Sequence, residues 1–320
     1  MAIIGQDLAL AIRILEKGEL VAIPTETVYG LAGNALDVMA VTKIFATKDR
    51  PYFDPIIVHV ASLEKALRFV TAVAPQAEQL VNHFWPGPLT LLLNKTEIIP
   101  YLVTAGLDRV GIRCPDHPLT RSLLEQIEFP LAAPSANPFG YVSPTTAQHV
   151  QDQLGDKISY ILDGGPCRIG IESTIIGWQD RETVIYRIGG VSVEQIESII
   201  GCVTVQPHYT SKPFAPGQLT SHYSPRKRIL LGDIQELIAK NQSHRVGILT
   251  FMAKKISGVE AVAHLILSQS GNLSEAARNL FSMLRQLDNM DIDIVLAEEV
   301  PNEGLGRAIN DRLRRAATNH

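Results

Sequence analysis

The sequence predicts a two-domain α/β protein, and three observations support this prediction. The chain has 320 residues, enough for two domains of roughly 100–200 residues each. Hydrophobic residues make up 46% and charged residues 19% of the chain, a balance that favours a packed core over disorder. Short apolar runs typical of strands alternate with amphipathic helical stretches, which is the pattern of an α/β sheet.

The first part of the chain carries most of this alternation. Near the N-terminus, Leu8, Ile12 and Leu15 recur at helical spacing and predict a helix. Apolar runs predict strands at 20–23, 56–60, 89–93, 110–113, 131–133 and 160–162. Amphipathic spacing predicts further helices at 38–47, 62–70, 119–126 and 146–154. We expect these elements to form one domain, residues 1–204, around a largely buried sheet.

The composition and the hydrophobic periodicity of the sequence change after residue 204. Residues 205–227 are rich in Pro, Ser, Thr and Gly and show no sustained periodicity, so we expect a linker or an ordered loop. A second alternation follows in residues 228–320, with strands expected at 229–231, 246–250, 263–267 and 292–297. Helices are expected at 234–240, 274–287 and 306–316. This order predicts a small second domain with a parallel sheet.

Charge and cysteine content narrow the class of protein. The formal net charge is −4 and the pI about 6.1, whereas a protein that grips a nucleic-acid backbone broadly is usually basic. Cys114, Cys167 and Cys202 follow no metal-ligand spacing and are interpreted as reduced thiols. The sequence shows no signal-type start and no apolar run near the roughly 20 residues of a membrane helix. We therefore expect a soluble, cytoplasmic protein.

The first candidate motif is PTETVYG, at 24–30, directly after an apolar strand. It gathers Thr25, Thr27, Tyr29 and a carboxylate at a strand exit, where ligands bind in open α/β sheets. The same residues are equally consistent with a turn whose hydroxyls cap the next helix.

A cluster of cations follows in the sequence. Lys48 and Arg50 stand at the end of a predicted helix, before a proline, and can present both charges to one phosphate. Cations in a last helical turn also offset the helix dipole without binding anything. His59 lies inside the apolar strand IIVHV. A histidine in such a strand is more often a core residue than a catalyst. A solvated or ligand-facing Arg50 contributes little to the packing of the core. Arg50→Ala is therefore expected to impair nucleotide use more than folding.

Later strand exits add further polar groups. Arg113 ends an apolar strand and therefore has a carboxylate partner or faces a site, whereas Arg109 stands at the solvated start of that strand. Ser135 and Asn137 could bind ribose, base or phosphate, or form a turn, and Ser143 could cap a helix. Hydroxyls, three arginines and a lysine at strand exits together suit a polyanionic nucleotide. The two common phosphate-loop motifs and the common zinc and serine hydrolase motifs are absent from the sequence.

The ordered motifs PTETVYGL, KDRP with DPIIVHV, WPGPLTLLL, VGIRCPDHP, APSANPFGYVSPTT, DGGPCRIGIESTII and YRIGG resemble those of the threonylcarbamoyl-AMP synthases. PGQLTSHYSP and PNEGLGRAINDRLRRAA resemble the two-domain form of that family. The resemblance implies a YrdC-like twisted α/β sheet domain, a linker across the active site and a small Rossmann-like parallel α/β domain.

The resemblance also implies an activity. Enzymes of this family combine L-threonine, bicarbonate or CO2, and ATP, the last with Mg²⁺, into L-threonylcarbamoyl-AMP and pyrophosphate. A separate tRNA threonylcarbamoyltransferase complex then passes the threonylcarbamoyl group to an adenosine beside the anticodon. No covalent nucleophile is needed, and no metal ligand from a protein side chain, organic cofactor, stable tRNA binding or membrane contact is implied.

Residue roles follow from matching positions in the motifs. The residues expected to hold threonine and its carbamate are Thr25, Thr27, Tyr29, His59, Arg113, Ala133 through its backbone, and Ser173. The residues expected to hold ATP are Lys48, Arg50, Asp54, Arg109, Ser135, Asn137, Ser143, Arg187 and Tyr223.

Two positions depart from the family pattern. The family often has Asn at the position of Asp54, and an acidic group there would repel phosphate unless Mg²⁺ intervenes. It often has a small hydroxyl residue at the position of Arg109, so only a backbone role transfers there. Two other functions stay open from the residues alone: an RNA-binding module, which the net charge disfavours, and a carbamoyl transferase acting on another acceptor.

Overall fold

The computed structural model describes residues 1–179, 182–206 and 223–318. The described residues fall into two compact units. Unit 1 consists of Met1–Phe139, Ser143–Arg168 and the residues from Glu172 to Gln206. Unit 2 consists of the residues from Tyr223 onward together with Gly140–Val142 and Ile169–Ile171. Most of the expected linker, 205–227, lies outside the described residues, so the expected domain limits stay a prediction.

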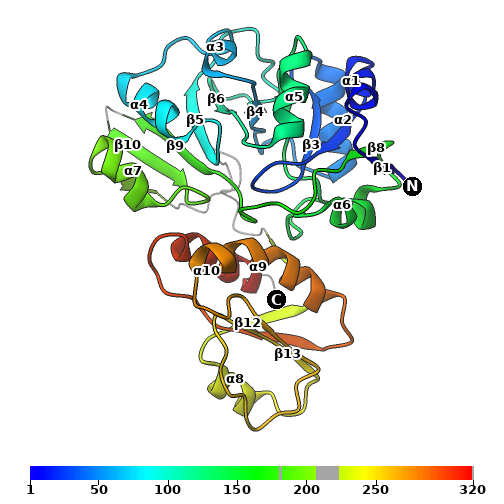
Figure 1. Cartoon of the computed structure of the whole chain (residues 1–320), viewed down its shortest axis with the longest axis vertical. Coiled ribbons are helices and arrows are strands. Elements are labelled where there is room, and N and C mark those ends of the chain that lie inside the picture. Colours follow the sequence, from blue (N-terminus) through cyan, green and yellow to red (C-terminus); the bar gives the residue numbers. More distant parts are fainter. Residues whose placement is uncertain (180–181, 207–222, 319–320) are drawn as a thin grey trace. The chain divides into compact units, whose positions relative to one another are not determined.

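Unit 1 is built on a mixed sheet of 11 strands in the order β1-β8-β2-β3-β7-β4-β6-β5-β9-β10-β11 (Figure 1). The strands are β1 (Ile3–Gly5), β2 (Val21–Ile23), β3 (Gly30–Asn34), β4 (Val58–His59), β5 (Leu89–Asn94), β6 (Arg109–Arg113), β7 (Leu131–Ala132), β8 (Tyr160–Leu162), β9 (Thr174–Gln179), β10 (Glu182–Arg187) and β11 (Thr204–Val205). The helices are α1 (Leu8–Glu16), α2 (Val38–Lys48), α3 (Leu63–Ala66), α4 (Pro75–Phe84), α5 (Pro118–Gln126), α6 (Ala147–Leu154) and α7 (Val193–Ile200).

Helices cover both faces of this sheet, as the pattern of β2 explains. Successive side chains of a strand point to opposite faces, and all three residues of β2 are buried. Ala22 packs in the core cluster that also contains Ile44 of α2, whereas Val21 packs in the cluster that contains Leu15 of α1. A strand buried on both faces has the continuous apolar sequence from which it was predicted.

Helix ends place the first candidate residues. Asp37 caps the N-terminus of α2 by accepting a hydrogen bond from the Met39 N–H. The helix ends at Lys48, because Asp49 takes a left-handed conformation with φ 53°. This turn sends Arg50 and the loop that leads to β4 back toward the sheet, and the Phe139 N–H donates to the Lys48 carbonyl.

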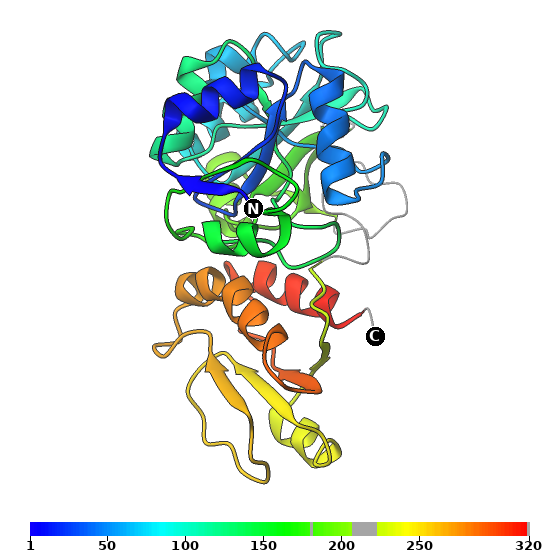
Figure 2. The same cartoon turned by 90° about the vertical axis from the view of Figure 1, so that its right-hand side faces the viewer.

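Unit 2 contains a parallel four-stranded sheet in the order β12-β15-β13-β14, as its sequence predicts (Figure 2). Its strands are β12 (Arg228–Leu231), β13 (Val246–Thr250), β14 (Ala263–Ile266) and β15 (Ile294–Ala297). Its helices are α8 (Ile234–Lys240), α9 (Leu273–Asp288) and α10 (Gly306–Ala317). The predicted fold class is confirmed for both units. None of the helices in the described ranges is long and apolar enough to cross a membrane.

Candidate functional site

The PTETVYG motif forms a tight turn between β2 and β3, and its hydroxyls brace it. The Thr25 hydroxyl donates to the Val28 carbonyl at 2.7 Å and accepts hydrogen bonds from the Thr27 and Val28 N–H groups. The Thr27 hydroxyl lies 2.8 Å from that of Thr25. The turn holds Glu26 inside the protein with 1% of its surface exposed. The motif is therefore a turn, but it leads into β3, so its hydroxyls brace the turn itself and cap no helix. That it lines a ligand site stays a prediction.

Glu26 is the carboxylate partner that was one of the two alternatives for Arg113. One carboxylate oxygen lies 2.7 Å from Nη2 of Arg113, and the other accepts the Asp116 N–H at 3.0 Å. Arg113 Nε donates to the Gly87 carbonyl at 3.2 Å. Glu26 is a residue that the sequence-based assignment missed, although its place between Thr25 and Thr27 was a usable signal.

Two atoms of this ion pair keep hydrogen-bonding capacity. Glu26 Oε1 and Arg113 Nη2 are buried, yet neither forms a hydrogen bond with another of the residues that the structure describes. Nδ1 of His59 is also buried and forms no hydrogen bond with the residues that the structure describes. His59 is paired in register with Arg113 across β4 and β6. These three polar atoms lie on neighbouring elements, and two of them are paired with each other.

His59 is neutral at ordinary pH. Burial, and then the positive charge of Arg113, lower its pKa to about 3. A histidine with that pKa does not exchange its charge near pH 7, so it serves here as a neutral hydrogen-bonding group rather than as an acid–base switch.

Lys48 and Arg50 occupy a second group of buried contacts. The Lys48 ammonium donates to the Ser135 and Asn137 carbonyls, each at 2.5 Å. Burial and the adjacent Arg50 lower the pKa of Lys48 well below its usual 10.5. Because a desolvated ammonium gains strongly from a nearby anion, Lys48 is suited to a phosphate.

Asp54, unexplained by the sequence, neutralises Arg50. Its carboxylate lies 2.9 Å from Arg50 Nη2, and both side chains are buried. Arg50 also donates to the Asp54 and Pro55 carbonyls. The expectation that Arg50 contributes little to folding is therefore wrong.

We accordingly predict a stability effect for Arg50→Ala. The substitution leaves the Asp54 carboxylate buried without its cation, which typically costs about 3–5 kcal/mol of unfolding free energy. Urea denaturation followed by circular dichroism measures the change. The double variant Arg50→Ala with Asp54→Ala is expected to recover part of the loss, and a single variant as stable as the parent protein would contradict the ion pair.

Ser173, at the start of β9, links to Arg187 at the end of β10. Arg187 donates to the Ser173 hydroxyl and carbonyl, each at 3.0 Å. The Ser173 hydroxyl also lies 2.8 Å from that of Thr90 on β5, a second residue that the sequence-based assignment missed. Glu172, which precedes Ser173 in the sequence, accepts a hydrogen bond from the Ser143 hydroxyl at 2.6 Å.

Backbone hydrogen bonds connect these groups within unit 1. Gly87, whose carbonyl accepts from Arg113, precedes Pro88, whose carbonyl accepts the Thr174 N–H. The Ala136 N–H, between Ser135 and Asn137, donates to the Tyr29 carbonyl. The Ala133 N–H is used within the sheet, where it donates to the Ile57 carbonyl.

Three of the expected residues make contacts elsewhere. The Tyr29 hydroxyl donates to the Gly165 carbonyl and lies 3.2 Å from the Asp163 carboxylate, and burial raises its pKa. Arg109, at the opposite end of β6 from Arg113, donates to the Tyr186 hydroxyl. Tyr223 belongs to unit 2, where its ring stacks on Phe281 with centroids 5.5 Å apart.

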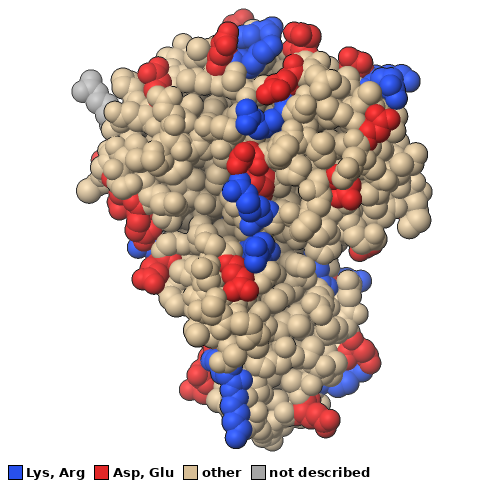
Figure 3. Space-filling model, viewed as in Figure 1, with Lys and Arg blue, Asp and Glu red and all other residues tan. Residues whose placement is uncertain are grey.

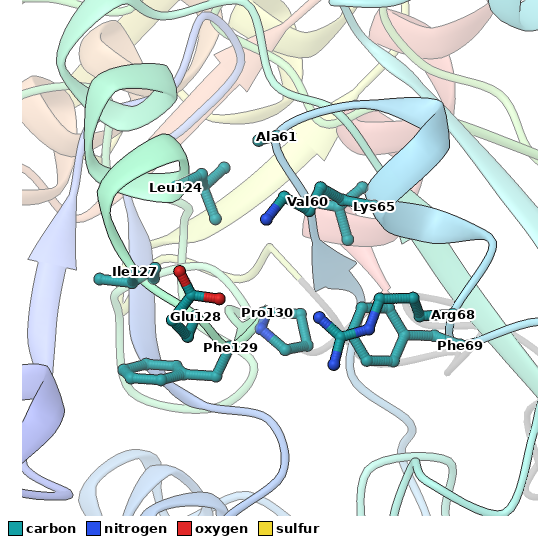
Figure 4. A pocket seen from close by; sticks show the side chains of 10 residues that line it. All are labelled: Val60, Ala61, Lys65, Arg68, Phe69, Leu124, Ile127, Glu128, Phe129 and Pro130. Carbon is teal, nitrogen blue, oxygen red and sulfur yellow. The ribbon is translucent and has the colours of Figure 1, made fainter.

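A small hollow lies apart from these residues, beside α3 and α5 (Figure 4). Its floor is apolar, and Lys65, Arg68 and Glu128 bring charges to it. It includes none of the residues expected to bind either substrate. On the face drawn in Figure 3, positive and negative side chains are interspersed among uncharged ones and form no broad basic patch.

Comparisons with known proteins give a consistent result for both parts of the chain. Residues 13–189 match a family model described as "Telomere recombination", and residues 191–318 match one described as "Threonylcarbamoyl-AMP synthase, C-terminal domain". The chain is 41% identical to a threonylcarbamoyl-AMP synthase of Pyrococcus abyssi, covering 96% of this chain and 93% of that protein. It is also 41% identical to one of Bacillus subtilis, covering 97% and 93% respectively.

A solved structure is similar over nearly the same span. A crystal structure of a P. abyssi homologue complexed with L-threonine superposes with a TM-score of 0.92 at 39% sequence identity. The superposition covers 99% of this chain and 97% of that one. The likeness therefore includes both sheets.

Proposed function

The chain belongs to the threonylcarbamoyl-AMP synthase family, and we propose that its buried polar residues form one subsite for threonine and another for the phosphates of ATP. The enzyme joins L-threonine, bicarbonate or CO2, and ATP to give L-threonylcarbamoyl-AMP and pyrophosphate. The observation that most supports the division is that Arg113 pairs with Glu26 and lies in register with His59, whereas Lys48 donates to the carbonyls of Ser135 and Asn137.

In the threonine subsite, Arg113 receives the substrate carboxylate. Its Nη2 faces Glu26 and carries a second N–H group, which can donate a charged hydrogen bond to a carboxylate. Neutral His59 and the hydroxyls of Thr27 and Ser173 hold the remaining polar groups of threonine and its carbamate. Thr25, Tyr29 and Ala133 support this subsite mainly by bracing the turn, the loop at Gly165 and the sheet.

In the phosphate subsite, Lys48 is the principal cation. Arg50, two residues further on, and Arg187, at the end of β10, are the other cations of this subsite. The carbamate oxygen attacks the α-phosphorus and pyrophosphate leaves, so negative charge grows on the leaving phosphates and a fixed cation stabilises it. Ser135, Asn137 and Ser143 contact the nucleotide, Asp54 acts through Arg50, and Arg109 contributes only its backbone. We propose a nucleotide contact for Tyr223 as well.

We propose that Mg²⁺ enters the site with ATP. The described residues include no cluster of three or more His, Cys, Asp or Glu side chains arranged to hold a metal ion. When bound, the ion neutralises phosphate charge. We further propose that the product passes to a tRNA threonylcarbamoyltransferase complex and that the chain acts in the cytoplasm.

Pyrophosphate release tests this function directly. Purified protein with MgATP is expected to release pyrophosphate only when both L-threonine and bicarbonate are present, because the carbamate is the nucleophile. A coupled pyrophosphate assay measures the rate, and mass spectrometry identifies the adenylate. Release that does not depend on threonine, or consumption of carbamoyl phosphate in its place, would overturn the proposal.

A further inference from the structure

Glu26 and Arg113 form an ion pair in the interior of unit 1. Both side chains are at least 95% buried, with Glu26 1% and Arg113 4% exposed. They lie on different elements, the turn after β2 and the end of β6, so the fold fixes their separation. Removing one partner of such a buried pair lowers the unfolding free energy strongly, so the pair is part of the folded interior rather than a surface contact.

The two facing atoms form a close ion pair. Oε1 and Nη2 are 2.7 Å apart, and neither makes a hydrogen bond with any further residue in the described ranges. Their other polar neighbours fix both side chains, because Glu26 Oε2 accepts from Asp116 and Arg113 Nε donates to Gly87. Each atom of the pair can still form one more hydrogen bond, because Nη2 carries two N–H groups and a carboxylate oxygen has two lone pairs.

We propose that Glu26 is a substrate-binding and specificity residue that receives the ammonium of threonine while Arg113 receives its carboxylate. An α-amino acid in neutral water carries both charges on adjacent carbon atoms. A matched carboxylate and guanidinium bind that zwitterion with little net change of charge in the buried site. The proposal deepens the proposed function and rests on it.

The charge balance also separates the two subsites. Arg113 is already neutralised by Glu26, so a polyanion gains little by approaching it. Lys48 is held by the carbonyls of Ser135 and Asn137, which carry no net charge. The zwitterion therefore has a neutral receptor, and the triphosphate has a cation held by neutral groups.

The pair also predicts selectivity among analogues of threonine. 3-Hydroxybutyrate has the carboxylate and hydroxyl of threonine and lacks its amine. With the parent protein, its inhibition constant against threonine is expected to exceed the KM of threonine by about 10-fold or more, because it leaves Glu26 without a donor. Equal affinity for the two molecules would overturn the proposal without any variant being made.

The variant Glu26→Gln separates binding from scaffolding. The KM for threonine is expected to rise about 10-fold or more, because the amide lacks the charge that holds the ammonium. The inhibition constant of 3-hydroxybutyrate is expected to stay the same or fall, since Arg113 then faces no competing carboxylate. The KM for ATP is expected to stay within about 2-fold, a change worth less than a typical hydrogen bond.

Matched variants complete the test. Glu64→Gln, at an exposed glutamate on α3, is expected to leave all three constants unchanged, and Glu26→Asp is expected to keep the preference for threonine over 3-hydroxybutyrate. If Glu26 had a purely structural role, Glu26→Gln would change the KM of threonine and the inhibition constant of 3-hydroxybutyrate by the same factor. That result would overturn the proposal. Failure of the proposed function is distinguishable, because the parent protein would then show no threonine-dependent release of pyrophosphate.

Discussion

Arg113→Lys is expected to lower kcat/KM for threonine by about 100-fold or more while leaving the protein folded. Lysine keeps a positive charge opposite Glu26, so the buried carboxylate is not left alone. It loses the planar fork that lets one arginine donate to Gly87, face Glu26 and still offer Nη2 to a substrate. Loss of one preorganised donor from a charged site commonly costs about 10²–10³-fold in rate.

Steady-state pyrophosphate release at saturating ATP measures this effect. Arg13→Lys, at an exposed arginine on α1, is the matched control and should behave as the parent protein does. Thermal unfolding of both variants shows whether folding is preserved. If Arg113→Lys retained the threonine KM and kcat of the parent protein, Arg113 would not be the carboxylate receptor.

The hydrophobic pattern predicted most of the scaffold. The residues of β8 and β13 form continuous apolar runs bounded by polar ones, and both strands lie at the expected positions. By contrast, β3 has the sequence GLAGN, whose glycines weaken any strand signal, and it was missed. It forms because its backbone pairs with β2 and β7, and that tertiary pairing outweighs local propensity.

The site was predictable as a set of residue types but not as a set of pairs. The sequence left two possibilities for Arg113, a carboxylate partner or a site, and the structure shows a carboxylate partner, Glu26. Glu26 lies 87 positions earlier, and no periodicity links positions so far apart. Asp54 lies only four positions from Arg50, yet their contact depends on the loop that follows the left-handed Asp49.

The pairing pattern also explains why burial alone does not identify the phosphate cation. Arg50, Arg113 and Lys48 are all buried, but the first two face carboxylates at 2.9 and 2.7 Å. Lys48 donates to carbonyls, which stabilise an ammonium without cancelling its charge. A phosphate therefore gains most from Lys48, and removing that charge is expected to be the most harmful change in the ATP subsite.

Lys48→Met is accordingly expected to lower kcat/KM for ATP by about 10²–10³-fold, the usual effect of losing a charge that stabilises a phosphoryl transition state. Methionine is similar in length, so the packing of α2 is retained. The matched control is Lys43→Met on the same helix, where the lysine pairs with Glu19 at the surface. ATP use by Lys48→Met equal to that of the Lys43→Met control would exclude Lys48 from the phosphate subsite.

The pH dependence gives this prediction a second readout. Burial and Arg50 lower the pKa of Lys48, so its ammonium is lost at a lower pH than the 10.5 of an ordinary lysine. The KM for ATP is expected to rise as pH increases through that lowered pKa, because only the charged form attracts phosphate. The same shift disfavours the charged lysine in the folded state, so its stability penalty is full below the lowered pKa and fades as pH rises toward the unfolded value. Lys48→Met should therefore lose the alkaline rise in the KM for ATP, and Lys48→Arg, which stays charged, should move it to higher pH.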